Sequence, residues 1–389
     1  MTSLIAGYAR TPFARFNGVF ADVKGTELGA HAAKAALERA GVPAEEVQRV
    51  FAGQVLQGGA GQNPARQSSV GAGISFNVPA MTLNAVCLSG TEAVVAGARM
   101  IDAGEVDVVV AIGQESMSLA PHVQHARAGA KYGAIEMLDT LEYDGLTDAF
   151  ESRSMGSSTE DGNSDLGIER AAQDEFSARS HQLAAASKDF HAGEIAPFTI
   201  SSRRGDTVIS EDDGVRADTT VETLAKLRPA FAKDGTITAG NASQITDGAA
   251  ALVLVSPQAA ERLGLTPIAE IVSHALVAGP DVRLHDQPAN AILAALEGTG
   301  LTPADLKVVE INEAFAAVGL RSTKKLGIDG NIVNPKGGAI ALGHPIGASG
   351  ARIIGTLARQ LAEQGAGSVG ATGICGGGGQ GSSVILRAL

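Results

Sequence analysis

The sequence has few residues of the kinds that form disulfides, aromatic clusters or metal sites. Its 389 residues include two cysteines and no tryptophan, and aromatic residues make up 4%. A chain of this length buries a large core without disulfides, so one bridge would add little stability. His122 and His125 have no third candidate ligand close in the sequence, so we expect no metal. Five further histidines are expected to lie at the surface or to cap helices: His31, His181, His191, His274 and His285.

Positive charge and long apolar runs are also scarce. The formal net charge is −12, which disfavours non-specific binding to nucleic acid because that binding needs a basic surface. No apolar run approaches the roughly 20 residues of a membrane span. We therefore expect neither a nucleic-acid partner nor a membrane partner.

Small aliphatic residues and glycine dominate what is present. Hydrophobic residues make up 44% of the chain, and there are 49 glycines. Valine and isoleucine runs with small residues are typical of strands covered by helices on both faces, which predicts an α/β fold. The length predicts two or three domains.

The chain contains an internal repeat. Residues 36–42 resemble residues 295–301, and the Ser-Gly pair at 89–90 matches the pair at 349–350, about 260 residues later. A long helix is predicted to begin at each pair. Each half predicts a helix, a strand, a glycine-rich loop, the long helix and another strand, in the order of right-handed βαβ units in a mostly parallel sheet.

A stretch of different character separates the halves. It is rich in charges and turn residues but keeps apolar spacing, which indicates an inserted loop domain, with its best helix from Glu169 to about Ala192. We assign residues 1–118 plus about 246–266 to the N-terminal half, 119–245 to the loop domain and 267–389 to the C-terminal half. Insertions of this kind commonly carry substrate recognition.

Cys87 lies in a short loop before the predicted helix at Ser89. The first turn of a helix offers unpaired N–H groups and the positive end of its dipole, so we expect a thiolate to be favoured there. A small buried hydrophobic residue is the alternative, and a disulfide with Cys375 is another. The motifs below favour a catalytic thiol over both.

His344 lies in a glycine-rich segment and is followed by Pro345. A neutral imidazole there can take a thiol proton and then donate a hydrogen bond to a developing oxyanion. The segment has no Gly-Lys-Ser/Thr ending, so neither a phosphate loop nor a dinucleotide site is favoured.

Two further polar groups follow predicted strands. Cys375 comes after the strand at 369–374 and begins a run of glycines, and Asn312 comes after the strand at 308–311. Ligand sites of open α/β sheets form at such strand ends. Asn312 can hold a water or a carbonyl oxygen there, although a simple helix start is the alternative for this residue.

In combination these motifs resemble the thiolase family, and the likeness extends from residues 9–12 to the last strand. The resemblance implies duplicated α/β halves in a layered αβαβα architecture with an inserted loop domain for coenzyme A binding and oligomerisation. It implies an acyltransferase of fatty acid metabolism that acts on acyl-CoA substrates, without a metal or redox cofactor, as a homodimer or homotetramer. Two free thiols imply a reducing compartment, so we expect a cytoplasmic protein.

The resemblance also assigns catalytic roles. Cys87 would be the acylated nucleophile, His344 its activating partner and Cys375 the acid/base at the substrate α-carbon. One oxyanion hole would consist of His344 and a water held by Asn312. The second would consist of the backbone N–H groups of Cys87 and Gly377.

Five residues are predicted by the same resemblance to contact coenzyme A. Ser243 ends a family motif that meets the pantetheine arm, and Arg216 stands where the family often places an arginine against the adenine. A solvated surface charge is the alternative for Arg216. Met155, Ala314 and Phe315 complete the predicted contacts.

Some positions depart from the family pattern. Ser154 and Asp161 stand where acetoacetyl-specific members commonly have His and Asn. An acetyl-CoA C-acetyltransferase is the preferred interpretation, and a degradative thiolase for longer 3-ketoacyl-CoA chains is the alternative. A silent carrier of acyl-CoA or lipid would lack the reactive groups. A decarboxylating ketoacyl synthase would carry a second histidine in place of Cys375.

Overall fold

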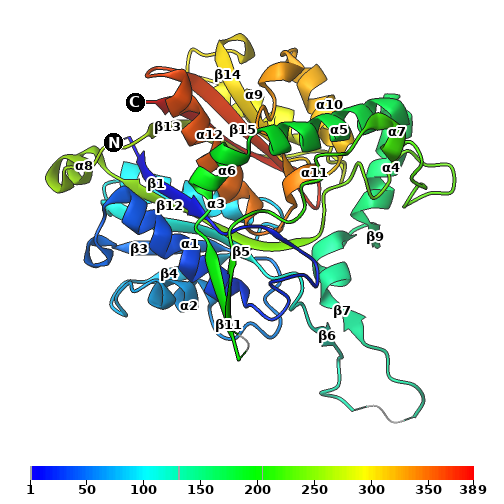
Figure 1. The fold of residues 1–389 in the computed structure, drawn as a ribbon, viewed down its shortest axis with the longest axis horizontal. Helices are drawn as coiled ribbons and strands as arrows, with labels where there is room; N and C mark the ends of the chain where they lie inside the picture. Colours follow the sequence, from blue (N-terminus) through cyan, green and yellow to red (C-terminus); the bar gives the residue numbers. More distant parts are fainter. Residues whose placement is uncertain (1, 130–131, 204) are drawn as a thin grey trace.

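The computed structural model describes residues 2–129, 132–203 and 205–389. These residues contain a ten-stranded sheet in which nine strands follow the order β14-β15-β16-β13-β1-β12-β5-β3-β4, and β2 pairs with β12 (Figure 1). Its strands are β1 (Leu4–Arg10), β2 (Ala14–Arg15), β3 (Arg49–Gly53), β4 (Ala80–Leu83), β5 (Val108–Glu115), β12 (Thr246–Val255), β13 (Ala269–Ala278), β14 (Leu306–Ile311), β15 (Val369–Gly376) and β16 (Gln380–Ala388).

The sheet is mixed, so the prediction of a mostly parallel sheet was wrong. β3 runs parallel to β4 and β5, and β14 runs parallel to β15, whereas β12, β1, β13 and β16 are antiparallel to their neighbours. The connection from β15 to β16 shows the reason. It consists of Gly377, Gly378 and Gly379, and the last two have φ of 78° and 71°. A link this short can join only antiparallel strands, because a parallel pair needs a crossover.

The helices form three layers, one on each outer face of the sheet and one between its two halves. This arrangement confirms the αβαβα layering (Figure 1). The outer layer of the N-terminal half is α1 (Gly25–Ala40), α2 (Pro64–Gly71) and α8 (Pro257–Leu263). The central layer is α3 (Ser89–Asp102) and α12 (Ser349–Gln364), and the other outer layer is α9 (Gln287–Leu296) and α10 (Ala316–Leu326).

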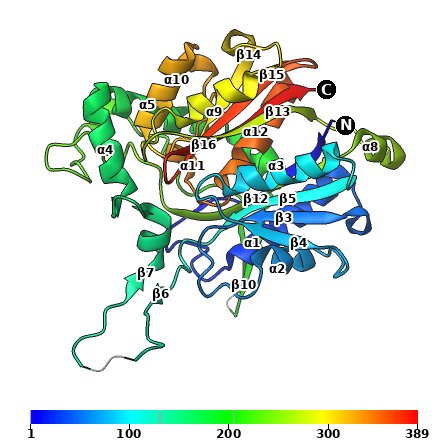
Figure 2. The same ribbon diagram turned by 180° about the vertical axis from the view of Figure 1, so that it is seen from behind.

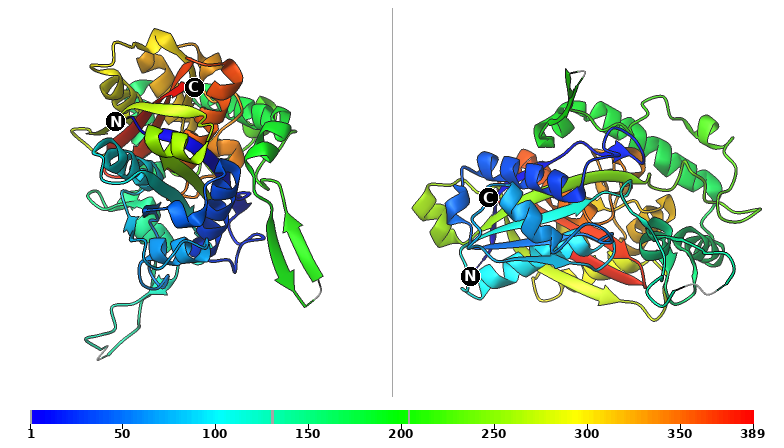
Figure 3. Two further views of the ribbon diagram at one scale, coloured as in Figure 1. Left: turned by 90° about the vertical axis from the view of Figure 1, so that its left-hand side faces the viewer. Right: turned by 90° about the horizontal axis from the view of Figure 1, so that it is seen from below.

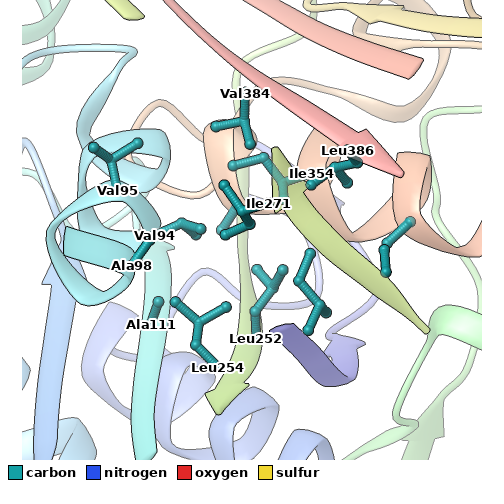
Figure 4. Packing of buried hydrophobic residues seen from close by; sticks show 14 of the residues in the cluster. Val94, Val95, Ala98, Ala111, Leu252, Leu254, Ile271, Ile354, Val384 and Leu386 are labelled. Carbon is teal, nitrogen blue, oxygen red and sulfur yellow. The ribbon is translucent and has the colours of Figure 1, made fainter. Parts of the chain in front are cut away.

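The two central helices form the main core with the inner faces of the sheet. Figure 4 shows Val94 and Ala98 of α3 near Leu254 of β12, with Ile354 of α12 beside Leu386 of β16. All five side chains are fully buried. Each helix therefore packs between the two halves, and neither half has a complete core without the other.

The repeated Ser-Gly pairs mark the place where α3 and α12 touch. A Cβ atom added at Gly90 would lie 2.7 Å from the nitrogen of Ala351, and one at Gly350 would lie 2.3 Å from the nitrogen of Thr91. Only glycine permits this backbone-to-backbone approach. The repeat therefore brings the two loops that precede these helices, with Cys87 and His344, to the same end of the central layer.

Two hairpins of the segment between the halves project from the body. The hairpin of β6 (His122–Val123) and β7 (Leu138–Asp139) extends away from the sheet (Figure 2), and β10 (Phe198–Ser202) with β11 (Gly205–Ile209) projects in another direction (Figure 3). The remaining elements are η1 (Ala44–Glu46), η2 (Leu141–Leu146), β8 (Thr147–Asp148), β9 (Arg153–Ser154), α4 (Met155–Leu166), α5 (Arg170–Ala186), α6 (Lys188–Glu194), α7 (Val221–Leu224), η3 (Pro303–Asp305), η4 (Gly330–Ile332) and α11 (Ala339–Leu342).

The helix predicted from Glu169 to about Ala192 is two helices, because α5 ends at Ala186 and α6 begins at Lys188. The proposed boundaries of the halves and the loop domain stay predictions. No helix of the described residues is long and apolar enough to cross a membrane.

Candidate active site

Cys87 is held at the start of α3 by a tight loop. Val86 has φ of 52°, a left-handed conformation that is costly for a β-branched residue. The Ser89 hydroxyl fixes this turn, since its Oγ accepts the N–H of Ala85 at 2.9 Å and donates to the carbonyl oxygen of Val86 at 2.6 Å. The loop therefore fixes Cys87 two residues before the first residue of α3.

The second cysteine and the glycine turn lie next to this sulfur. The backbone N–H of Gly377 donates a hydrogen bond to Cys87, and charge on Cys87 acts on the titration of Cys375. Both cysteines, which lie within the described residues, are free thiols. The structure thus brings Cys87, Cys375 and Gly377 together, and the disulfide alternative is not realised.

Burial sets the protonation of both thiols. It raises the pKa of Cys87 to about 12, with a smaller contribution from the negative charge of Glu115, and it also raises the pKa of Cys375. The expectation that the helix N-terminus favours a thiolate was therefore wrong for the unliganded protein. Desolvation is the largest influence on each thiol, and it favours the protonated form at neutral pH.

His344 is buried beside Asn312. Its Nδ1 lies 2.6 Å from Ser349 Oγ, and its Nε2 lies 3.4 Å from Asn312 Nδ2. Burial, with the positive charge of Arg352, lowers the pKa of His344 to about 3. The imidazole is therefore neutral at physiological pH, with one nitrogen oriented by Ser349 and the other on the side of Asn312.

Glu115 is a buried carboxyl group that was not predicted from the sequence, and it joins two segments of the site. Glu115 accepts the N–H groups of Val55 at 3.0 Å, Leu56 at 3.1 Å and Gly347 at 3.0 Å. Burial raises the pKa of Glu115 to about 7, and no cation in the described part of the chain is paired with it. Glu115 thereby fixes the loop after β3 to the segment that follows His344. A polar residue at the end of the apolar strand at 108–113 was the available signal.

Of the residues predicted to contact coenzyme A, Arg216 alone lies apart from the surroundings of Cys375. Met155, Ala314 and Phe315 belong to the hydrophobic cluster that contains Cys375. The backbone N–H of Ser243 donates to the carbonyl oxygen of Ala314 at 3.0 Å, so Ser243 is adjacent. Arg216 is exposed and belongs to a separate loop.

The departures at Ser154 and Asp161 have structural roles of their own. The hydroxyl of Ser154 caps α4 by accepting the N–H of Ser157 at 3.2 Å. Asp161 forms an ion pair with Arg153 at the surface. Neither residue reproduces the side chain that the family pattern has at its position.

A large cavity opens beside the thiols. Its volume is about 1260 Å³, and its lining includes Val86, Met155 and Gly377 next to Cys87. Its lining also includes acidic residues, Asp139 and Glu142 among others. The cavity gives a substrate room to reach Cys87, and its acidic residues disfavour phosphate groups.

Together these groups can transfer an acyl group through sulfur. Cys87 packs against the cluster that contains Ile346, two residues after the neutral imidazole of His344, and a neutral imidazole can take a thiol proton on attack. The N–H of Gly377 that bonds to Cys87 is a donor of the kind that stabilises an oxyanion. A second buried thiol supplies a separate acid/base. Among residues 2–129, 132–203 and 205–389 no cluster of His, Cys, Asp and Glu has the makeup of a metal site.

Comparison with known proteins agrees with this chemistry. The family model described as "Thiolase, N-terminal domain" matches residues 3–258, and "Thiolase, C-terminal domain" matches residues 265–388. A probable acetyl-CoA acetyltransferase of Mycolicibacterium smegmatis is 54% identical, over 99% of this chain and 100% of the relative. An acetyl-CoA acetyltransferase of Rhizobium meliloti is 46% identical over 99% and 98%.

A crystal structure of the Bacillus anthracis acetyl-CoA acetyltransferase superposes on this chain with a TM-score of 0.95 and 37% identity, over 100% of this chain and 99% of that one. Two family models that together span almost the whole sequence, and relatives of this identity over their full length, leave one assignment: the chain belongs to the thiolase family.

Proposed function

We propose that this chain is an acetyl-CoA C-acetyltransferase, which condenses two molecules of acetyl-CoA into acetoacetyl-CoA and coenzyme A, or runs the reverse thiolysis. The observation that carries the proposal is the pair of free, buried thiols of Cys87 and Cys375, with the N–H of Gly377 on the Cys87 sulfur. The names of the relatives support the same activity. Coenzyme A takes part as substrate, and the proposal includes no other cofactor.

The first half-reaction transfers an acetyl group to Cys87. His344 takes the thiol proton as the sulfur attacks the thioester carbon, and the N–H groups of Cys87 and Gly377 stabilise the oxyanion. The carbon–sulfur bond to coenzyme A breaks, and Cys375 donates its proton to the departing sulfur. Acetyl-Cys87, an imidazolium and the Cys375 thiolate remain.

The second half-reaction forms the carbon–carbon bond. The Cys375 thiolate takes an α-proton from a second acetyl-CoA, and a thiolate of raised pKa is a strong base for this task. His344 and a water on Asn312 stabilise the enolate oxygen. The enolate carbon attacks acetyl-Cys87, and the released Cys87 sulfur recovers its proton from His344, so that all protons balance.

A degradative thiolase of longer 3-ketoacyl-CoA chains is the second candidate. The cavity of about 1260 Å³ next to Val86 and Gly377 offers space beyond an acetyl group, and Ser154 is a smaller side chain than the histidine of acetoacetyl-specific members. These two features favour longer chains. They are the reason to test chain length directly.

The experiment measures thiolysis of acetoacetyl-CoA and of 3-ketoacyl-CoA substrates with longer chains, by loss of the 3-keto thioester with free coenzyme A. Fast cleavage confined to acetoacetyl-CoA supports the acetyltransferase, and a preference for longer chains supports the degradative enzyme. Absence of cleavage for all substrates would refute both and revive the silent carrier. Cys87→Ser is the control, expected to be inactive throughout.

We also propose that the protein assembles as a homodimer or homotetramer. β4 is the last strand of the sheet, with Met81 exposed, and an unpaired strand edge is suited to pairing with a second copy. The projecting β6–β7 hairpin carries exposed Val123 and Met137, which favours a role in further association. The requirement for two free thiols supports a reducing, cytoplasmic location, and the chemistry supports a role in fatty acid metabolism.

A further inference from the structure

One side chain connects the segment that carries Arg216 with the segment that carries His344. The Nε2 of Gln244 lies 3.1 Å from the carbonyl oxygen of Gly214, 3.0 Å from that of Ile340 and 3.2 Å from that of Ala341. The backbone carbonyl of Gln244 accepts the N–H of His344 at 3.0 Å. Gln244 therefore contacts both segments through its amide and the histidine through its main chain.

The contacts around Gln244 leave little free space. A Cβ atom added at Gly214 would lie 2.8 Å from the carbonyl oxygen of Ala341 and 2.9 Å from Nε2 of Gln244. Gly343, next to His344, has φ of 105°, and a Cβ atom there would lie 2.3 Å from Thr246 Cγ2. Because such packing has no void to absorb a shift, a movement of one segment displaces the other.

A hydrogen bond holds the backbone of Arg216, whereas its side chain is exposed. The N–H of Arg216 donates to Nδ1 of His181 at 3.1 Å, while the arginine side chain is exposed. His181 is buried, contrary to the expectation of a surface residue, and burial lowers its pKa to about 4. The neutral ring can accept this hydrogen bond. A ligand phosphate or adenine bound by Arg216 would therefore act on a segment that Gln244 joins to the catalytic histidine.

We propose that Gln244 is a positioning residue that turns binding of the nucleotide end of coenzyme A into correct placement of His344. This inference rests on the proposed function. Binding energy from a remote part of a substrate raises kcat when it fixes the reacting geometry, and it lowers only KM when it does not. Full coenzyme A thioesters are then the substrates that obtain the complete rate, and thioesters of pantetheine, which lack the nucleotide, lose kcat as well as affinity.

The test compares thiolysis of acetoacetyl-CoA by coenzyme A with thiolysis of acetoacetyl-pantetheine by pantetheine. The variant is Gln244→Met, which keeps the side-chain length and has no N–H to donate. We expect kcat with acetoacetyl-CoA to fall about tenfold, the loss for one interaction made in the transition state, and kcat with acetoacetyl-pantetheine to change less than about twofold. Gly214→Ala, which crowds the same contact from the other segment, is expected to give the same pattern.

Gln182→Met is the matched control. The Nε2 of Gln182 donates to the carbonyl oxygen of Thr219 at 3.3 Å in the same region, so its loss is expected to leave the ratio of the two kcat values unchanged. Equal losses of kcat on both substrates in the Gln244→Met and Gly214→Ala variants would overturn the coupling and leave only a structural role. Unchanged kcat on both substrates would overturn it as well. A wild-type enzyme inactive on both substrates would instead refute the proposed function.

Discussion

The two cysteines have different surroundings although burial raises the pKa of both. Cys87 has the N–H of Gly377 and the strained loop at Val86, which suit a nucleophile whose acyl product must be held in place. Cys375 lies at the end of β15 in an apolar cluster with Ala314 and Phe315. This position suits a strong base that must be shielded from water. Removing either thiol is therefore expected to affect the two half-reactions to different extents.

Replacing Cys375 with alanine is expected to abolish condensation and to slow, without abolishing, acetylation of Cys87. Proton donation to the departing coenzyme A is then left to water, so exchange of the acetyl group between acetyl-CoA and labelled coenzyme A slows by about 10²-fold to 10⁴-fold at most, the usual range for a lost acid/base. Release of α-tritium from acetyl-CoA falls to background. The rates of acetyl exchange and of tritium release are both measured on one enzyme preparation. Normal tritium release in Cys375→Ala would show that another group removes the α-proton.

Glu115 couples stability to pH. Its pKa is raised from 4.5 to about 7 by burial, with a smaller contribution from Asp247, so the folded protein holds this proton over a range in which the unfolded chain has lost it. The contribution of Glu115 is therefore most favourable below pH 4.5 and declines until about pH 7. The full decline is roughly 3 kcal/mol.

The measurement is urea unfolding of the wild type and of Glu115→Gln at pH 5 and pH 8. We expect the free energy of unfolding of the wild type to decrease more between these pH values than that of the variant, by up to roughly 3 kcal/mol. Comparing the two pH slopes cancels groups common to both proteins, such as Glu310, whose pKa is also raised to about 7 by burial. Identical slopes would mean that Glu115 titrates normally in the folded protein.

At the scale of the elements, the crossing of α3 and α12 positions the two reactive loops. The Gly90→Ala substitution is expected to destabilise the protein by about 1–3 kcal/mol, the usual cost of overpacking, and to reduce kcat because it separates the loops of Cys87 and His344. Chemical denaturation and thiolysis rates measure the two effects. Gly330→Ala is the control, because an added Cβ meets nothing within 4 Å there. Equal stability of the two variants would contradict the close crossing.

The sequence predicted the long helices and several strands well because their signals are local. The apolar strand at 308–311, the Ser-Gly pairs and the loops of Cys87 and His344 all lie where the repeat placed them. Strand direction was missed, because a buried antiparallel strand such as β12 has the same continuous apolar pattern as a parallel one. The partners of Glu115 and Gln244 are backbone groups, which no sequence pattern marks, so the polar residue at the end of a strand was the one signal for Glu115, and Gln244 had none.

At the scale of the whole molecule, the exposed edge of the sheet carries the proposed two-fold contact. The Met81→Glu substitution on β4 is expected to convert a dimer to monomers, since Met81 is 55% exposed and two copies of the new charge would meet across the axis. Sedimentation velocity at micromolar protein gives the mass. Val221→Glu, at an exposed valine on α7, is the control. A dimer that persists in Met81→Glu would place the contact elsewhere.

The halves are joined in the sheet by two paired positions of β1 and β13, Leu4 with Glu270 and Ile5 with Ala269, and the chain passes between them through α8. A cut in α8, which lies at the side of the body in Figure 1, would leave each fragment with its own outer core but without the central helix of the other. Fragment complementation follows from this design. Each fragment alone would be catalytically inactive, and thiolysis would return only when the fragments reassociate. The recovered rate of thiolysis would therefore measure docking of the two halves.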